Sequence, residues 1–297
     1  MADVTDAAFR RVIAKYGKPD VTWTEFVSAD GLVSAGREIL KMDLRYTEAE
    51  RPIVAQLFSA HPNRMEEAAK LVQELGFDGL DINMGCPDKS IEKQGAGAAH
   101  IKNPIIAKEI IRSAKRGAPN IPVSVKTRVG YNKNELETWL PALLEEEPAV
   151  LTLHARTRKE MSKVPAHWED VKKAVEIRDR LGSSTLIFGN GDVKNLAEAR
   201  KRVEETGCDG VMIGRGIFGN PWLFREHEPT LVEKLNVMVE HTKLFEELMT
   251  GVKSFALMKK HYKAYVNNFD GAKELREKLM EAKDANEIAK ITNDFIN

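Results

Sequence analysis

A chain of 297 residues can bury a large core as one barrel with a small appendage. Its 45 basic and 45 acidic residues balance, which excludes a globally basic surface that coats nucleic acid; any such binding needs a local patch. Two cysteines, Cys86 and Cys208, are too few for a secreted disulfide scaffold, and no apolar run approaches roughly 18 residues. We therefore expect a cytoplasmic protein without a membrane segment.

Short apolar, β-branched runs alternate with amphipathic helical segments along most of the chain. The runs are residues 21–26, 53–58, 79–83, 122–127, 150–154, 185–188 and 210–213, and helices are predicted at 63–75, 104–114, 135–144, 168–181 and 195–206. This alternation predicts a parallel α/β sheet with crossover helices. Because each run ends in polar or glycine residues, side chains suited to catalysis or binding are expected at the C-terminal ends of successive strands. That favours a closed (β/α)8 TIM barrel over an open doubly wound sheet.

The predicted strands number seven, one fewer than a (β/α)8 barrel needs. The chain starts directly with a helix pattern at residues 5–11, for which Thr5 is a suitable N-cap. Residues 1–4 have the character of a loop that follows a first strand. We therefore expect the first barrel strand to be missing or truncated in this chain.

The strand pattern stops near Pro229, and helical periodicity continues to residue 297. Apolar residues recur at helical spacing over 235–248, 255–266 and 272–279, with breaks expected at Gly251 and Asn267-Asn268. The sequence thus predicts a barrel domain over residues 1–229 and a small all-helical domain over residues 230–297.

The segment Asn83-Met84-Gly85-Cys86-Pro87-Asp88 places a cysteine just after the predicted strand 79–83. Glycine permits a tight turn and proline cannot continue the strand, so the thiol is aimed outward at a strand end. Barrel enzymes have their active sites at these strand ends. The alternative is a buried free cysteine that serves only as a small apolar side chain.

Two glycine-rich turns, Gly189-Asn190-Gly191-Asp192 and Gly214-Arg215-Gly216, follow the last two predicted strands. Loops at these places often bind phosphate in this fold, because glycine lets backbone N–H groups approach and Arg215 offers a bidentate fork. Two ordinary tight turns are the alternative. Residues 94–99 have a superficial dinucleotide-binding pattern, but they lie well past their strand, so we predict an active-site loop there instead.

Cations alternate on two predicted strands: Lys126 with Arg128, and His154 with Arg156. Residues two apart share a strand face, so these side chains converge on one barrel mouth, where burial requires an anionic or electron-rich ligand. Exposed strand ends and a structural histidine are the alternatives. Together with the thiol and the glycine turns, these groups predict a phosphorylated cofactor with an electron-rich ring. We expect no metal site, because no histidine has zinc-ligand spacing with either cysteine.

Almost end to end, the chain resembles the tRNA-dihydrouridine synthase family, flavin-dependent reductases of uridine in tRNA. Besides the opening Met1-Ala2-Asp3-Val4-Thr5-Asp6, the matching motifs are Val54-Ala55-Gln56-Leu57, Asp81-Ile82-Asn83-Met84-Gly85-Cys86-Pro87, Val125-Lys126-Thr127-Arg128, Leu153-His154-Ala155-Arg156-Thr157, Asn190-Gly191-Asp192 and Met212-Ile213-Gly214-Arg215-Gly216. The Asn-x-Gly-Cys-Pro motif is highly specific in this context. Ala155 and Gln94 replace glycines that are common in the family, and both are mild departures.

This resemblance implies FMN as cofactor, with NADPH or NADH as the electron donor. It implies that Cys86 is the acid that protonates C5 of uracil after hydride reaches C6. The implied cofactor-binding residues are Met1, Ala2, Gln56, Lys126, His154, Asn190, Gly191, Asp192, Gly214 and Arg215. Asn83, Arg128 and Arg156 are implied at the substrate. The helical tail resembles the family's tRNA-binding domain, with Lys259 and Lys260 of the basic stretch 253–263 at tRNA phosphates, in a monomer.

Two other functions remain open on the sequence. One is a flavin barrel that acts on a free pyrimidine such as dihydroorotate, although such an enzyme does not need a basic helical tail. The other is a non-catalytic RNA-binding relic, which a missing barrel strand makes plausible.

Overall fold

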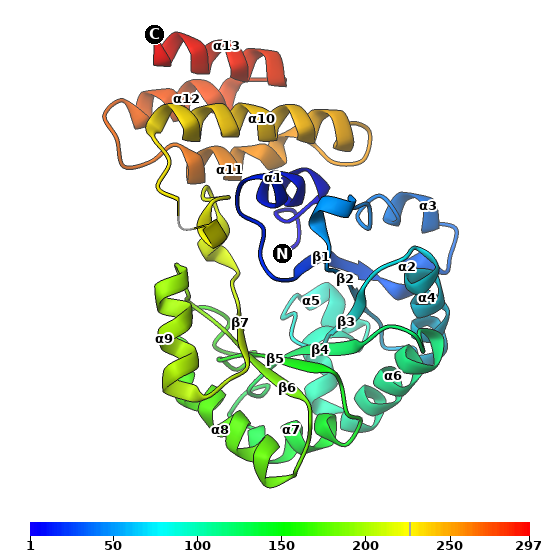
Figure 1. Ribbon diagram of the computed structural model, residues 1–297. Coiled ribbons are helices and arrows are strands. Elements are labelled where there is room, and N and C mark those ends of the chain that lie inside the picture. Colours follow the sequence, from blue (N-terminus) through cyan, green and yellow to red (C-terminus); the bar gives the residue numbers. More distant parts are fainter. Residues whose placement is uncertain (226) are drawn as a thin grey trace. The chain divides into compact units, whose positions relative to one another are not determined.

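The computed structural model describes residues 1–225 and 227–297 (Figure 1). These residues divide into two compact units. One unit comprises residues 1–25, 42–51 and 216–297, and the other comprises residues 26–41 and 52–215. Within the described residues, no helix is both long and apolar enough to cross a membrane. The division into domains at residues 1–229 and 230–297 stays a prediction.

In the part of the chain that the structure describes, seven strands form one sheet in which strands consecutive in the chain are neighbours. They are β1 (Thr22–Ser28), β2 (Ile53–Phe58), β3 (Gly79–Asn83), β4 (Val123–Arg128), β5 (Val150–His154), β6 (Leu186–Asn190) and β7 (Gly210–Met212). All pairs from β2 to β7 are parallel, and the curled sheet has an arc of helices along its outer side (Figure 1). The TIM-barrel-like fold is confirmed. No strand precedes β1 among the described residues, as expected for a barrel order without its first strand.

Helices connect the strands of the larger unit and cover the outside of the sheet. They are α2 (Ala29–Leu32), α3 (Arg37–Leu40), α4 (Pro62–Glu74), α5 (Lys89–Lys93), the 3₁₀ helix η2 (Gly97–Lys102), α6 (Pro104–Gly117), α7 (Leu136–Leu144), α8 (Trp168–Arg180) and α9 (Leu196–Thr206). Proline at the first position of α4 and α6 suits a helix start, because its missing N–H has no helical partner there. The buried face of α6 includes Ile110 and Ile111. This packing fixes the strand ends that carry the polar side chains.

The smaller unit is helical. It contains α1 (Ala7–Gly17), η1 (Glu48–Glu50), η4 (Leu223–Arg225), α10 (Leu231–Met249), η5 (Phe255–Leu257), α11 (Met258–Tyr265), α12 (Ala272–Glu281) and α13 (Ala285–Ile296), and η3 (Arg215–Ile217) begins at its edge. The predicted breaks are confirmed, since Gly251 and Asn268 have positive φ angles of 78° and 60°. Phe9 of α1 stacks on His241 of α10 with ring centres 4.8 Å apart. The N-terminal helix therefore shares a core with helices more than 200 residues later.

The N-cap of α1 is Asp6, so the prediction of Thr5 was wrong by one residue. The Asp6 carboxylate accepts a hydrogen bond of 3.0 Å from the Phe9 N–H, whereas the Thr5 hydroxyl accepts one of 2.7 Å from the N-terminal amine. Asp6 is only 1% exposed, and burial, followed in smaller measure by the nearby Glu25, raises its pKa to about 6. Its ionised form is therefore disfavoured in the folded protein.

Replacing Asp6 with Asn should stabilise the protein at pH 8. A carboxyl whose folded pKa is raised contributes its full stability below its unfolded pKa and loses it as pH rises through about 6. Asparagine keeps the cap acceptor and does not ionise, so it avoids a loss of up to about 3 kcal/mol. Thermal unfolding should show a gain at pH 8 that disappears towards pH 4. Asp88→Asn, at the exposed N-cap of α5, is the control and should show no such gain; a D6N gain independent of pH would contradict the assignment.

Candidate active site

The predicted polar side chains of the larger unit lie at the C-terminal ends of its strands. The register places Asn83 beside Lys126, and Arg128 beside His154, which in turn neighbours Asn190. One edge of the sheet thus gathers Gln56, Asn83, Cys86, Lys126, Arg128, His154, Arg156, Asn190, Gly191, Asp192, Gly214 and Arg215. Met1, Ala2, Lys259 and Lys260 belong to the other unit. Among the described residues, no cluster of three or more His, Cys, Asp or Glu side chains could hold a metal ion.

The Cys86 loop, residues 84–88 between β3 and α5, is held by hydrogen bonds at both ends. Asn83 Oδ1 accepts from the N–H groups of Gly85 and Cys86, at 3.2 and 2.9 Å. The Cys86 carbonyl accepts from the Ala98 N–H at 2.9 Å. Gly97, with φ of 61°, lies so close that a Cβ there would be 2.7 Å from the same carbonyl. The stretch 94–99 therefore lies against Cys86, and its role as an active-site loop stays a prediction.

The Cys86 side chain is partly buried against Phe58, Ile91 and Ala96. Burial raises the pKa of the thiol above its usual 9.0, although Arg128 and Lys126 oppose this effect weakly. The side chain is therefore protonated at neutral pH. A protonated thiol can donate a proton, whereas a nucleophilic cysteine needs a lowered pKa.

Arg128 ties the Cys86 loop to the segment that follows β5. Its Nε donates to the Gly85 carbonyl at 2.7 Å, and Nη1 donates to the carbonyls of Thr157 and Met161 at 3.1 Å. The side chain is buried, and this burial lowers its pKa to about 10. The Arg128 guanidinium is therefore fully charged at neutral pH.

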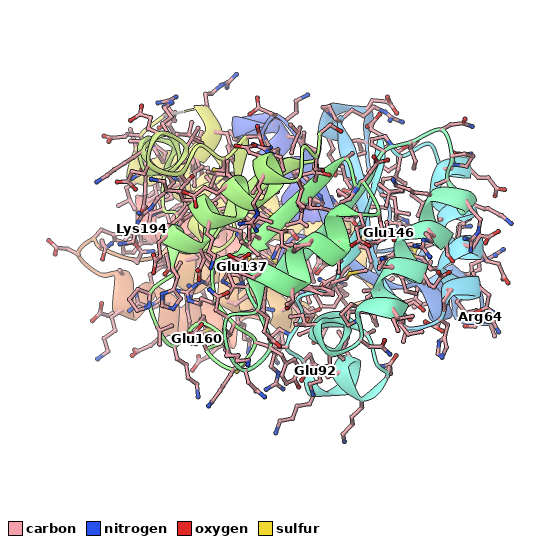
Figure 2. All side chains as sticks on the ribbon, turned by 90° about the horizontal axis from the view of Figure 1, so that it is seen from below. Arg64, Glu92, Glu137, Glu146, Glu160 and Lys194 are labelled. Atoms are coloured by element: carbon pink, nitrogen blue, oxygen red, sulfur yellow. The ribbon has the colours of Figure 1, made fainter. Side chains whose placement is uncertain are left out.

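Two acids labelled in Figure 2 act at the same place, one between the two segments and one within the segment after β5. Glu92 of α5 forms an ion pair with Arg158, and Glu160 accepts from the Thr157 N–H at 2.7 Å. The Glu92–Arg158 ion pair therefore joins α5 to the segment after β5 in addition to Arg128, and Glu160 fixes the backbone of that segment.

Lys126 presents a cation that the described residues leave without a hydrogen bond or ion pair. Burial lowers its pKa to about 8, and the positive charge of Arg128 lowers it further than the carboxylate of Asp81 can offset. Its ammonium is therefore mostly charged at pH 7. An unpaired cation in such a place fits an electron-rich or anionic ligand.

His154 is a neutral histidine whose proton position follows from its neighbour. Burial and the surrounding cations, Lys126 first among them, hold its pKa far below the usual range. Arg156 Nη1 lies 3.2 Å from His154 Nε2, and because arginine can only donate, Nε2 is the acceptor. The histidine proton is then on Nδ1, where it can serve as a hydrogen-bond donor.

The turns after β6 and β7 are joined by an acid between two arginines. Asp192 pairs with the buried Arg156 and accepts from Arg215 at 2.8 Å, while Arg215 remains 62% exposed. Gly191 has φ of 138°, and a Cβ there would be 2.7 Å from the Cβ of Ala166, so only glycine suits this turn. Asn190 Nδ2 donates to the Met212 carbonyl at 2.7 Å. The arrangement holds backbone N–H groups and an exposed guanidinium in one place.

Sequence reasoning missed two residues of this edge, Asp81 and Ser124. The Asp81 carboxylate is fully buried and accepts hydrogen bonds from Gln56 and Ser124. One signal was available, because Asp81 is a charged residue within the otherwise uncharged strand Gly79–Asn83. A charge in a buried strand requires partners.

The family model described as dihydrouridine synthase (Dus) matches residues 1–297. The chain belongs to the dihydrouridine synthase family. It is 39% identical to a "Probable tRNA-dihydrouridine synthase 2" of Bacillus subtilis (strain 168), a match that covers 99% of this chain and 92% of that protein. It is 38% identical to a "Probable tRNA-dihydrouridine synthase" of Staphylococcus aureus (strain MRSA252), over 99% of this chain and 91% of that protein.

Solved structures similar to this dihydrouridine synthase family member confirm the fold. A 2-naphthoyl-CoA reductase has a TM-score of 0.56 at 13% identity, over 76% of this chain and 46% of its own. A morphinone reductase has a TM-score of 0.53 at 14% identity, over 75% of this chain and 82% of its own. At these identities the likeness concerns the fold alone.

Proposed function

We propose that this protein reduces the C5–C6 double bond of uridines in tRNA to 5,6-dihydrouridine in the cytoplasm, with FMN as cofactor and NADPH or NADH as electron donor. The observation that carries the proposal is the protonated Cys86 thiol on a fixed loop, at the same sheet edge as the unpaired ammonium of Lys126. Such a pair supplies a proton donor and a cation to one reaction centre.

The residues at the edge fit FMN. Lys126 would offer its charge to the pyrimidine side of the flavin ring, and His154 Nδ1 and Gln56 would contribute hydrogen bonds. The phosphate would be held by the exposed guanidinium of Arg215 and by backbone N–H groups of the turns at Asn190, Gly191, Asp192 and Gly214. Met1 and Ala2, which belong to the other unit, remain proposed cofactor residues. When bound and reduced, FMN supplies a hydride to C6 of uracil.

The chain's own groups complete the reaction. Addition of hydride at C6 places negative charge on C5 and on the C4 carbonyl oxygen, and Cys86 gives its proton to C5. One hydride and one proton together add two hydrogens across the double bond. The target base must leave its stack to reach the strand ends.

Asn83, Arg128 and Arg156 are proposed on the substrate side. Asn83 Nδ2 gives one N–H to Gln56, and its second N–H is suited to a uracil carbonyl. Arg128 acts through the Cys86 loop that it holds, and Arg156 through His154 and Asp192.

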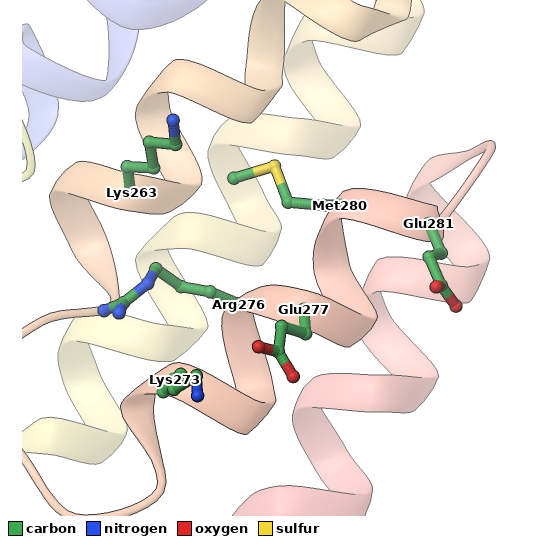
Figure 3. A pocket seen from close by; sticks show the side chains of 6 residues that line it. All are labelled: Lys263, Lys273, Arg276, Glu277, Met280 and Glu281. Carbon is green, nitrogen blue, oxygen red and sulfur yellow. The ribbon is translucent and has the colours of Figure 1, made fainter.

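The helical unit offers local positive charge to tRNA. Lys259 and Lys260 of α11 are partly exposed, and a cavity of about 380 Å³ between α11 and α12 is lined by Lys263, Lys273, Arg276, Glu277, Met280 and Glu281 (Figure 3). Lys253 does not belong to this surface, although the basic stretch 253–263 included it. Its ammonium is 2.5 Å from Glu25 and 3.1 Å from Asp43, so acids of the same unit neutralise it.

Reversing the charges of Lys259 and Lys260 to Glu should weaken tRNA binding and reduce its dependence on salt. Removing one phosphate contact should lower the slope of log K against log salt by about 1. Filter binding across a salt series measures both quantities. The same reversal at Lys172 of α8 and Lys201 of α9 matches the change in net charge and should leave the slope unchanged. Equal effects of the two pairs would mean that another surface carries the RNA.

The direct test of the function combines cofactor and substrate. Purified protein should show flavin absorbance, and with NADPH it should form dihydrouridine in unmodified tRNA, which mass spectrometry detects. Free uracil and orotate serve as the comparison substrates. Turnover of a free pyrimidine without tRNA turnover would favour the small-molecule flavin enzyme, and absence of bound flavin would favour the RNA-binding relic.

A further inference from the structure

The larger unit contains a buried acid that takes no part in the proposed transfer of hydride and proton. Asp81 of β3 is in register with Gln56 of β2 and Ser124 of β4. Its carboxylate accepts from Gln56 Nε2 at 2.6 Å and from Ser124 Oγ at 2.5 Å. Burial raises the pKa of Asp81 to about 6, so at neutral pH it is ionised and only accepts hydrogen bonds.

From Asp81, a line of hydrogen bonds leads to the Cys86 loop. Gln56 Oε1 accepts from Asn83 Nδ2 at 3.0 Å, and Asn83 Oδ1 accepts from the Gly85 and Cys86 N–H groups. Each amide thus donates at one end and accepts at the other. The line connects a proposed cofactor residue, a proposed substrate residue and the loop of the proposed acid.

The two ends of this line determine its direction. A carboxylate can only accept, and backbone N–H groups can only donate. Between them, each of the two amides has a single orientation that satisfies every bond. If Gln56 turned over, its carbonyl would face the Asp81 carboxylate and its NH2 group would face that of Asn83. Asn83 would then have to turn its own NH2 group towards the loop N–H groups.

We propose that Asp81 is a positioning residue for the reaction, which acts through Gln56 and Asn83 to fix the Cys86 loop and the N–H that Asn83 offers to the substrate. Its effect on catalysis rests on the proposed function. Its effect on the Cys86 loop does not.

The catalytic test compares Asp81→Leu with Asp81→Asn. Leucine has a similar size but removes the acceptor, so the kcat for tRNA reduction should fall about 100-fold, while FMN binding changes little. Asparagine can still accept from Gln56 and donate to the Ser124 oxygen, so kcat should recover to within about tenfold of the parent. A role in packing alone would make leucine at least as active as asparagine. A role through charge alone would make the two variants equally poor. Either result overturns the proposal.

A second readout needs neither cofactor nor tRNA. Alkylation of Cys86 by iodoacetamide, followed by mass spectrometry, reports how firmly the loop is held, and the buried Cys208 is the internal reference. Loss of a positioning hydrogen bond should raise the Cys86 rate about tenfold in D81L and leave it near the parent value in D81N. An unchanged rate in D81L overturns the proposal.

The two readouts separate the proposal from the function on which it rests. If the parent protein makes no dihydrouridine, the proposed function fails, and alkylation alone decides the role of Asp81. If D81L does not fold, Gln56→Met interrupts the same line one residue later and should raise the alkylation rate equally; a parent-like rate there overturns the proposal.

Discussion

Replacing Cys86 with Ala is expected to lower the rate of dihydrouridine formation by roughly 10²- to 10⁴-fold, the usual contribution of a general acid. The flavin should still bind and still be reduced by NADPH, because the side chain contributes only part of a small apolar contact with Phe58, Ile91 and Ala96. Single-turnover experiments separate these steps: flavin reduction stays fast, and its reoxidation by tRNA becomes slow.

The matched control is Cys208→Ala, which removes the other thiol of the chain from a buried place and should leave tRNA reduction unchanged. Burial raises the pKa of the Cys86 thiol from its usual 9.0. Deprotonation of this thiol should therefore lower the activity of the parent enzyme only above pH 9. The alanine variant should lack that alkaline limb. Near-normal product formation by C86A would remove Cys86 from the mechanism.

Much of the fold follows from local patterns. The seven strands are predictable because each is a short apolar run between turn residues, and buried parallel strands need apolar side chains on both faces. The N-cap of α1 was misplaced by one residue because Thr5 and Asp6 are both good caps, and only the backbone decides between them.

The partners of buried charges are less predictable. Lys253 reads as part of a basic surface, but its acid Glu25 is 228 residues away in the chain. Asp81 likewise acquires its role from Gln56 and Ser124 on neighbouring strands. Motifs therefore indicated where a candidate site lies, whereas the contacts that orient its side chains depend on long-range packing.

Replacing Lys126 with Met should slow the oxidation of reduced flavin by tRNA by about 10²- to 10³-fold, the loss typical of a removed charge-stabilising donor. Methionine preserves the length and apolar stem of the side chain, so the change removes the charge and little else. Stopped-flow absorbance of the flavin measures the step directly. Lys126→Arg, which keeps a cation of different shape, should recover part of the rate.

The pH dependence distinguishes this role from a loss of folding. The active form of Lys126 is its ammonium, and its pKa is lowered to about 8, so the rate of the parent should fall as pH rises through 8. Cys86→Ala should keep this limb, whereas K126M should lack it and be slow at every pH. Lys108→Met, on the outer surface of α6, is the control for loss of one positive charge and should retain both rate and limb. A K126M protein that still loses activity near pH 8 would show that a different group provides the cation.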